Sequence, residues 1–160
     1  MMKHTPPPQA EIDQWHRWFA VECNNTAWGL AEKSDRSEEE SQQMLQCAIA
    51  SAWHWSQVGQ EVHEARAEML LAWAHAQAGL GDAAVKHAQQ ARALVDQPVD
   101  GVHVWDKAFM PLTEAIAAQA ARDTAGYRRA LEATKAARES LGDPKDLAVF
   151  DQFAALIPNT

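Results

Sequence analysis

The chain has 160 residues, the length of one domain, which can bury enough surface to fold without disulfides or metals. Alanine supplies 32 residues and Val, Ile and Thr together 19, so the composition argues against a large β-sheet. The net charge of -8 argues against a nucleic-acid partner, because such binding needs a basic face. Seven Trp residues remain unexplained by these numbers.

The two ends of the chain differ in character. Residues 1–8 include three consecutive prolines and are predicted to form an extended lead-in, whereas residues 9–160 are predicted to form a single helical domain. The lead-in lacks the apolar stretch of a secretory signal, and no later apolar run reaches the roughly 18 to 20 residues of a membrane span. We therefore expect a cytoplasmic protein without a membrane partner.

The first predicted helix covers residues 9–33. Its apolar residues recur at three- and four-residue steps, which predicts that the stripe they form faces a core. The residues of this stripe are Ile12, Trp15, Phe19, Cys23, Ala27 and Leu30.

A second helix is predicted to begin after Ser37, which forms a capping box with Glu40, and to continue to about residue 57. Residues 47–55 are apolar on nearly every side of this helix. That pattern predicts a helix surrounded by other helices.

Five more helices follow. Two are predicted at 61–78 and 82–95, the second capped by Asp82, before a loop at 96–103. A fifth, at 106–121, carries Pro111 either in its first turns or at a kink. Asp123 is predicted to cap a sixth helix, and Asp143-Pro144 to open a seventh that ends near Ile157.

Short turns between helices predict antiparallel neighbours. Residues 65–98 resemble one tetratricopeptide (TPR) unit, and Gly126, Ala130 and Ala133 repeat part of the pattern more loosely. The matching residues of the unit are Leu71, Ala72, Gly79, Ala84, Ala88 and Ala91. Glu68 and His75 depart from the repeat, in which these positions hold Trp and Tyr. Trp53–Ser56 also resembles a stretch of uncharacterised bacterial TPR-like proteins.

The resemblance implies an all-α fold of about seven antiparallel helices, arranged as three TPR-like helix pairs with a C-terminal capping helix. The alternative fold is a closed helical bundle in which the spacing of the alanines is incidental. Small residues at the matching positions would let paired helices approach closely.

Catalytic and metal-binding patterns are not evident in the sequence. No two of the seven histidines are three or four residues apart, so we expect no metal and no cofactor. No phosphate-binding glycine loop and no nucleophile elbow occur, and no catalytic residue is assigned. Antiparallel packing could bring His75 and His87 to one level, because they lie at similar distances from the turn near Leu80.

In a TPR the first helix of each pair lines a concave groove, where the resemblance places Arg66, Met69, Trp73 and Gln77. We therefore expect a non-catalytic TPR-like scaffold that binds a protein or peptide, with a homodimer as a further option. The alternative is a small-molecule-binding or enzymatic bundle with a pocket around His54, in which at least two other polar groups converge on that ring.

Overall fold

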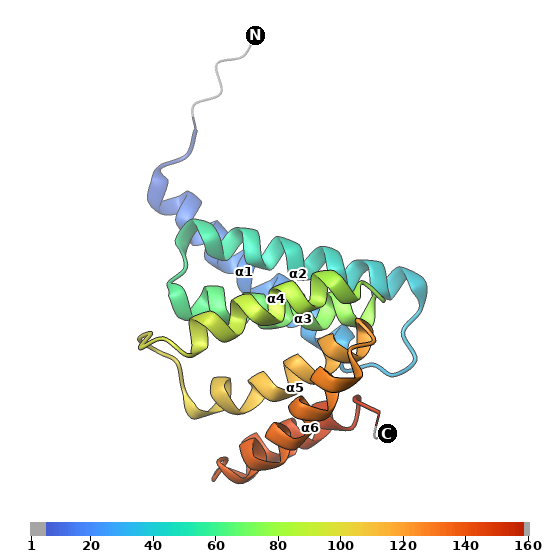
Figure 1. The fold of residues 1–160 in the computed structure, drawn as a ribbon. Coiled ribbons are helices and arrows are strands. Elements are labelled where there is room, and N and C mark those ends of the chain that lie inside the picture. The colour runs from blue at the N-terminus through green and yellow to red at the C-terminus, as the bar shows by residue number, and fades with distance from the viewer. Residues whose placement is uncertain (1–5, 159–160) are drawn as a thin grey trace.

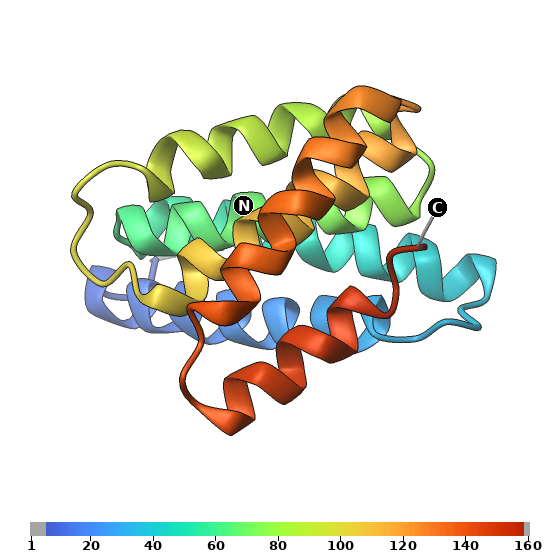
Figure 2. The ribbon, with the colours of Figure 1, turned by 60° about the horizontal axis from the view of Figure 1, so that its bottom comes forward.

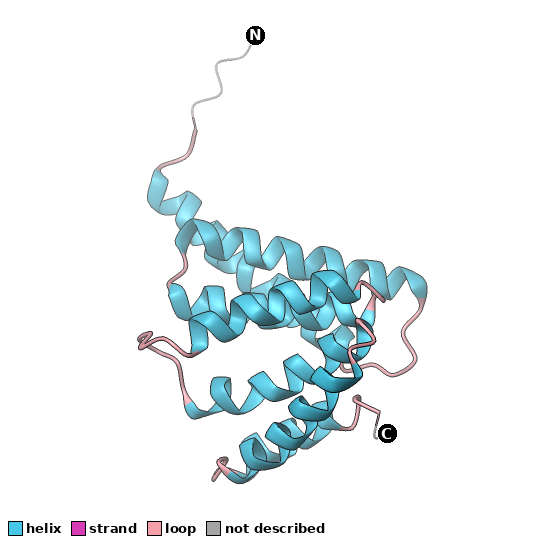
Figure 3. Ribbon diagram, viewed as in Figure 1, coloured by secondary structure: helices cyan, strands magenta, loops and turns pink. Residues whose placement is uncertain are grey.

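The computed structural model describes residues 6–158, which form seven α-helices and no strand (Figures 1 and 3). The helices are α1 (Gln9–Ala31), α2 (Glu38–Val58), α3 (Glu61–Gln77), α4 (Gly81–Val95), α5 (Val104–Ala120), α6 (Thr124–Glu139) and α7 (Pro144–Ala154). Of the predicted lead-in, Pro6, Pro7 and Pro8 are exposed and outside any helix, and residues 1–5 lie outside the described part.

The described helices pack as three antiparallel hairpins, α1–α2, α3–α4 and α5–α6, laid one against the next. Within this stack α2 packs on α3 and α4 packs on α5, while α1, α3 and α5 are also neighbours. Figure 1 shows the first hairpin at the top and α6 near the bottom. The predicted all-α architecture of paired helices, with a seventh after the third pair, is confirmed.

Side chains at the helix starts explain most of the boundaries. Ser37 and Glu40 form the predicted capping box on α2, and the carboxylates of Asp123 and Asp143 accept backbone N–H groups at the starts of α6 and α7. The start of α5 was predicted two residues too late. His103 precedes α5, and its N–H donates to the Asp106 carboxylate at 2.9 Å, so Asp106 caps from inside the first turn.

The start of α4 differs from the prediction, because Asp82 lies in the first turn and Leu80 is at the capping position. Gly81 begins the helix directly against the end of α5. A Cβ atom at Gly81 would lie 2.5 Å from the backbone oxygen of Ala120 and 2.5 Å from the nitrogen of Ala121. A glycine is therefore required where the second and third hairpins meet.

We expect Gly81→Ala to lower the free energy of unfolding by about 1 to 3 kcal/mol, because the added methyl group overpacks this contact. Gly29→Ala is the matched control: a Cβ atom there meets nothing within 4 Å, and alanine favours a helix by up to about 1 kcal/mol. Urea denaturation would measure both. A Gly81→Ala protein as stable as the Gly29→Ala protein would contradict the close approach of α4 and α5.

Small residues do lie between the paired helices, as expected. Ala72, Ala84 and Ala91 are fully buried, and Ala88 and Ala130 are nearly so. Ala133 is an exception, because α4 and α6 diverge and leave a hollow of about 540 Å³ that Ala133 lines.

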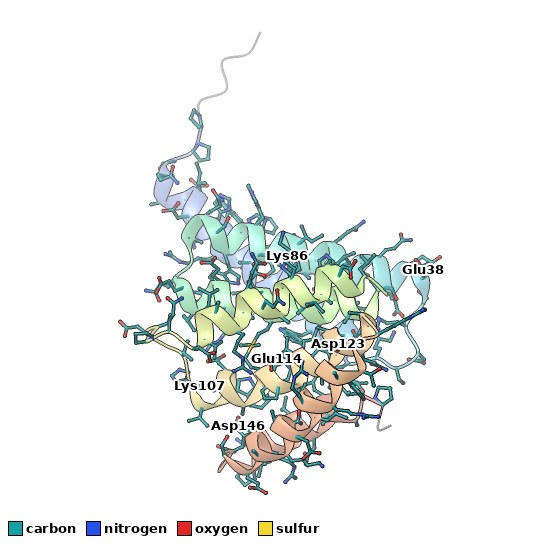
Figure 4. All side chains as sticks on the ribbon, in the orientation of Figure 1. Glu38, Lys86, Lys107, Glu114, Asp123 and Asp146 are labelled. Atoms are coloured by element: carbon teal, nitrogen blue, oxygen red, sulfur yellow. The ribbon has the colours of Figure 1, made fainter. Side chains whose placement is uncertain are left out.

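An ion pair crosses the floor of this hollow. Arg92 on α4 donates two hydrogen bonds to Glu114 on α5, at 2.8 and 2.9 Å. Glu114 is labelled in Figure 4, where it lies between the second and third hairpins. The pair therefore ties α4 to α5 at a level where the small residues of α4 and α6 leave open space.

The most deeply buried helices are α3 and α5, rather than α2. Ile49 and Trp53 on α2 are half exposed, so the prediction that residues 47–55 are surrounded by other helices is wrong. The reason is the position of α2 at the end of the stack, where α1 and α3 cover it and its remaining side is free. Pro111 lies beyond the first turn of α5 and is buried.

Candidate functional site

The predicted groove is largely closed. Trp73 is completely buried, and its indole N–H donates to the Thr113 hydroxyl at 3.1 Å. Met69 is buried as well. The expectation that these two side chains are open to a partner is therefore wrong, and both belong to the core.

Helix α7 closes the groove. Phe153 lies edge-on to the rings of Trp28, Trp73 and Phe109, with centroid distances of 5.2, 5.2 and 5.3 Å. These rings come from α1, α3 and α5, the first helices of the three hairpins. Figure 2 shows α7, in red, returning from the α6 end of the stack toward α1, in blue. The seventh helix thus covers the inner face of the stack as well as following its last hairpin.

The other two predicted groove residues have partners within the chain. Arg66 donates two hydrogen bonds to Asp106, at 2.8 and 2.9 Å, and Asp106 is buried. The side-chain amide of Gln77 donates to the Ala31 carbonyl at the end of α1, at 3.0 Å. What remains of the groove is a hollow of about 290 Å³ at the edge of α7, which Arg66 and Met69 both line.

Large aromatic side chains are instead exposed on the first hairpin. The exposed fractions are 52% for Trp15, 51% for Trp18, 41% for Phe19 and 55% for Trp53. We call these four residues, with His16, His54 and Ile49, the aromatic face. The prediction that the α1 stripe faces a core is therefore wrong at Trp15 and Phe19.

The aromatic face is a connected cluster of rings. Trp18 and Phe19 are in edge contact at 4.9 Å, and Trp15 lies 6.2 Å from Trp18. The His54 ring stacks on Phe19 at 5.4 Å and meets Trp53 at 4.8 Å. The cluster therefore joins α1 to α2 across the surface of the hairpin.

Two histidines lie at the centre of this cluster. The Nδ1 atoms of His16 and His54 are 2.8 Å apart, so one nitrogen donates and the other accepts. The accepting ring is therefore neutral. Burial, and secondarily the neighbouring His16, lower the pKa of His54 below its ordinary value. Sequence reasoning missed this contact, because 38 residues separate the two rings along the chain.

The aromatic face lies on the free side of the first hairpin. Trp28, on the same helix as Trp15, points inward to Trp73 and Phe109. Thirteen residues separate Trp15 from Trp28, which is about 140° around an α-helix. On α2, Trp55 stacks on His63 of α3 at 4.2 Å, whereas Trp53 turns away from α3. No other described hairpin covers this side, at the top of the stack in Figure 1.

A second histidine cluster joins α3 to α4. The rings of His75 and His87 are 4.8 Å apart, so the expectation that they reach one level is confirmed. His87 donates from Nδ1 to the Glu68 carboxylate at 2.6 Å, and His75 donates to the Leu71 carbonyl at 2.7 Å. Burial is the main cause that lowers the pKa of His75. In residues 6–158, no group of three or more His, Cys, Asp or Glu side chains is arranged to hold a metal ion.

The fold and the aromatic face together define a short stack of helical hairpins with one apolar end. Comparison with protein-family models, with curated proteins and with solved structures finds no match for the chain. None of the described helices combines the length and the apolar character needed to span a lipid bilayer.

Proposed function

We propose that the chain is a non-catalytic, TPR-like scaffold that binds another protein or peptide through the aromatic face. The observation that carries this proposal is the exposure of Trp15, Trp18, Phe19 and Trp53 on one side of one hairpin. Contiguous exposed apolar patches of this kind mark interaction sites, and Trp is strongly enriched among residues that dominate binding energy.

The position of the aromatic face strengthens the proposal. In stacked-repeat proteins the terminal repeats need a polar outer face for solubility. The first hairpin departs from that rule, since its outer face carries three tryptophans. A partner that covers this face would remove the exposed apolar surface from water.

The proposed surface differs from the groove that a TPR resemblance implies. The groove positions Met69 and Trp73 are core residues, and Phe153 of the chain's own α7 packs on that side. Binding at the end of the stack requires no displacement of α7. The proposal therefore keeps the scaffold function and moves its surface from the groove to the first hairpin.

A catalytic pocket at His54 gains no support from the site. The rings around His54 in the described residues are His16, Phe19 and Trp53, and of these His16 alone has a group suited to acid–base work. The condition for that alternative, two further polar groups converging on the ring, is not met.

The test is affinity capture with the full chain as bait, followed by titration of each captured protein in pure form. Three baits are compared: the unchanged chain, Trp15→Ser/Trp53→Ser, and the control Val104→Ser, which changes an exposed apolar residue on α5. We expect a binder retained by the unchanged and control baits and lost by the double variant. A binder that the double variant retains equally well would show that binding uses another surface. If none of the captured proteins binds the pure chain on titration, the scaffold function is refuted.

A further inference from the structure

We infer that the aromatic face is a homodimer interface, in which the first hairpin of one copy packs against the first hairpin of a second copy. This inference rests on the proposed function and names the occupant of the same surface. The dimer would join two stacks end to end about a twofold axis, so that the three hairpins of each copy form one run of six.

The first argument comes from the packing of the other hairpin surfaces. The second hairpin is packed on both sides, by the first through α2–α3 and by the third through α4–α5. The contact between the first two hairpins uses stacked rings, Trp55 against His63. The outer side of the first hairpin offers the same chemistry, with Trp53 and His54 next to Trp55, and lacks a neighbour in the described chain. A hairpin of matching shape and polarity is the occupant that fits, and a second copy supplies one.

The second argument is charge. Residues 41–60, which include most of α2, contain no Asp, Glu, Lys or Arg. On α1 the segment from Trp15 to Val21 has one charged residue, Arg17. The core of the aromatic face is therefore nearly free of charge, as the cores of protein interfaces are.

This charge pattern also selects between partners. An acidic or basic peptide would find no complementary charge at the centre of the face. A second copy carries the same net charge of -8, so its approach is opposed at long range and assisted by salt screening. Self-association through this face should therefore strengthen, or stay unchanged, when the ionic strength rises.

The third argument is area. Helices α1 and α2 have 23 and 21 residues, so they are about 34 and 31 Å long. Two such helices side by side, each about 10 Å wide, present a face of roughly 650 Å². A stable interface buries about 800 Å² on each partner, so the dimer interface would extend from the aromatic face over the rest of the hairpin.

The experiment is sedimentation equilibrium of the purified full chain over a wide range of concentration, at low and high salt. We expect a monomer–dimer equilibrium whose dimer fraction does not fall as salt increases. Trp53→Glu and Ile49→Glu should each raise the dissociation constant by at least about 30-fold, the effect of losing an interface hot spot. The matched control Val104→Glu, on α5, should leave it unchanged.

Several outcomes would overturn the inference. A monomer at every concentration would do so, as would a dimer that Trp53→Glu and Ile49→Glu leave intact or that Val104→Glu also disrupts. Circular dichroism checks the folding of each variant, and having two variants keeps the test valid if one fails to fold. Because sedimentation uses the chain alone, a monomeric result would not contradict binding of a captured partner at the aromatic face. Conversely, failure to capture a partner would not contradict the dimer.

Discussion

Trp73→Ala is expected to destabilise the chain by about 3 to 5 kcal/mol, the range for deleting a buried large aromatic side chain. Trp73 is completely buried, stacks on Phe109 at 5.6 Å and is covered by Phe153. Its replacement would leave a cavity at the point where α3, α5 and α7 meet. Denaturation by urea, followed by circular dichroism, would measure the loss.

One further variant separates the parts of this effect. Trp73→Phe keeps most of the ring volume but removes the indole donor, so it tests the hydrogen bond to Thr113. We expect it to cost less than Trp73→Ala, because most of the cavity remains filled. If Trp73→Ala instead leaves stability unchanged and weakens partner binding, then Trp73 is a groove residue and its burial under α7 is incorrect.

Phe153→Ala is the second large effect, also expected at about 3 to 5 kcal/mol. Phe153 is nearly fully buried and touches rings from α1, α3 and α5. Its loss removes three ring contacts that hold α7 on the inner face. Besides lower stability, we expect faster amide hydrogen exchange in residues 144–158 and a shift of tryptophan emission to longer wavelength as water reaches Trp28 and Trp73.

Val149→Ala is the matched control for Phe153→Ala. It truncates an apolar residue on the same helix that is 41% exposed, so we expect a change within about 1 kcal/mol and normal exchange in α7. Equal effects of the two variants would mean that α7 contributes through helix formation alone. Such a result would contradict its role in covering the groove.

Sequence reasoning was most successful where local chemistry decides the structure. Ser37, Asp123 and Asp143 mark helix starts through hydrogen bonds that span two or three residues, and each was placed correctly. The prediction for α4 missed that its first residue, Gly81, lies against the backbone at Ala120, which leaves no room for a side chain. A pattern of capping residues carries no information about such a contact.

The site was harder to predict, because helical periodicity identifies an apolar stripe and not what covers it. Trp15 and Phe19 share a stripe with Ala27, yet the alanine is buried and the two aromatic residues are exposed. The difference arises because the end of the stack lies beyond α1 and α2. Trp73 shows the opposite error, since its cover is Phe153, 80 residues further along the chain.

The return of α7 to α1 also changes how the stack should unfold. In a simple array of repeats each unit touches its nearest neighbours, so an end unit can detach while the rest stays folded. Phe153 and Trp28 connect the last helix of the chain to the first, and the Arg138–Asp151 ion pair ties α7 to α6. The chain is thereby closed into a loop of contacts. Loss of the third hairpin would also uncover the first, which favours unfolding of all three hairpins in one cooperative step.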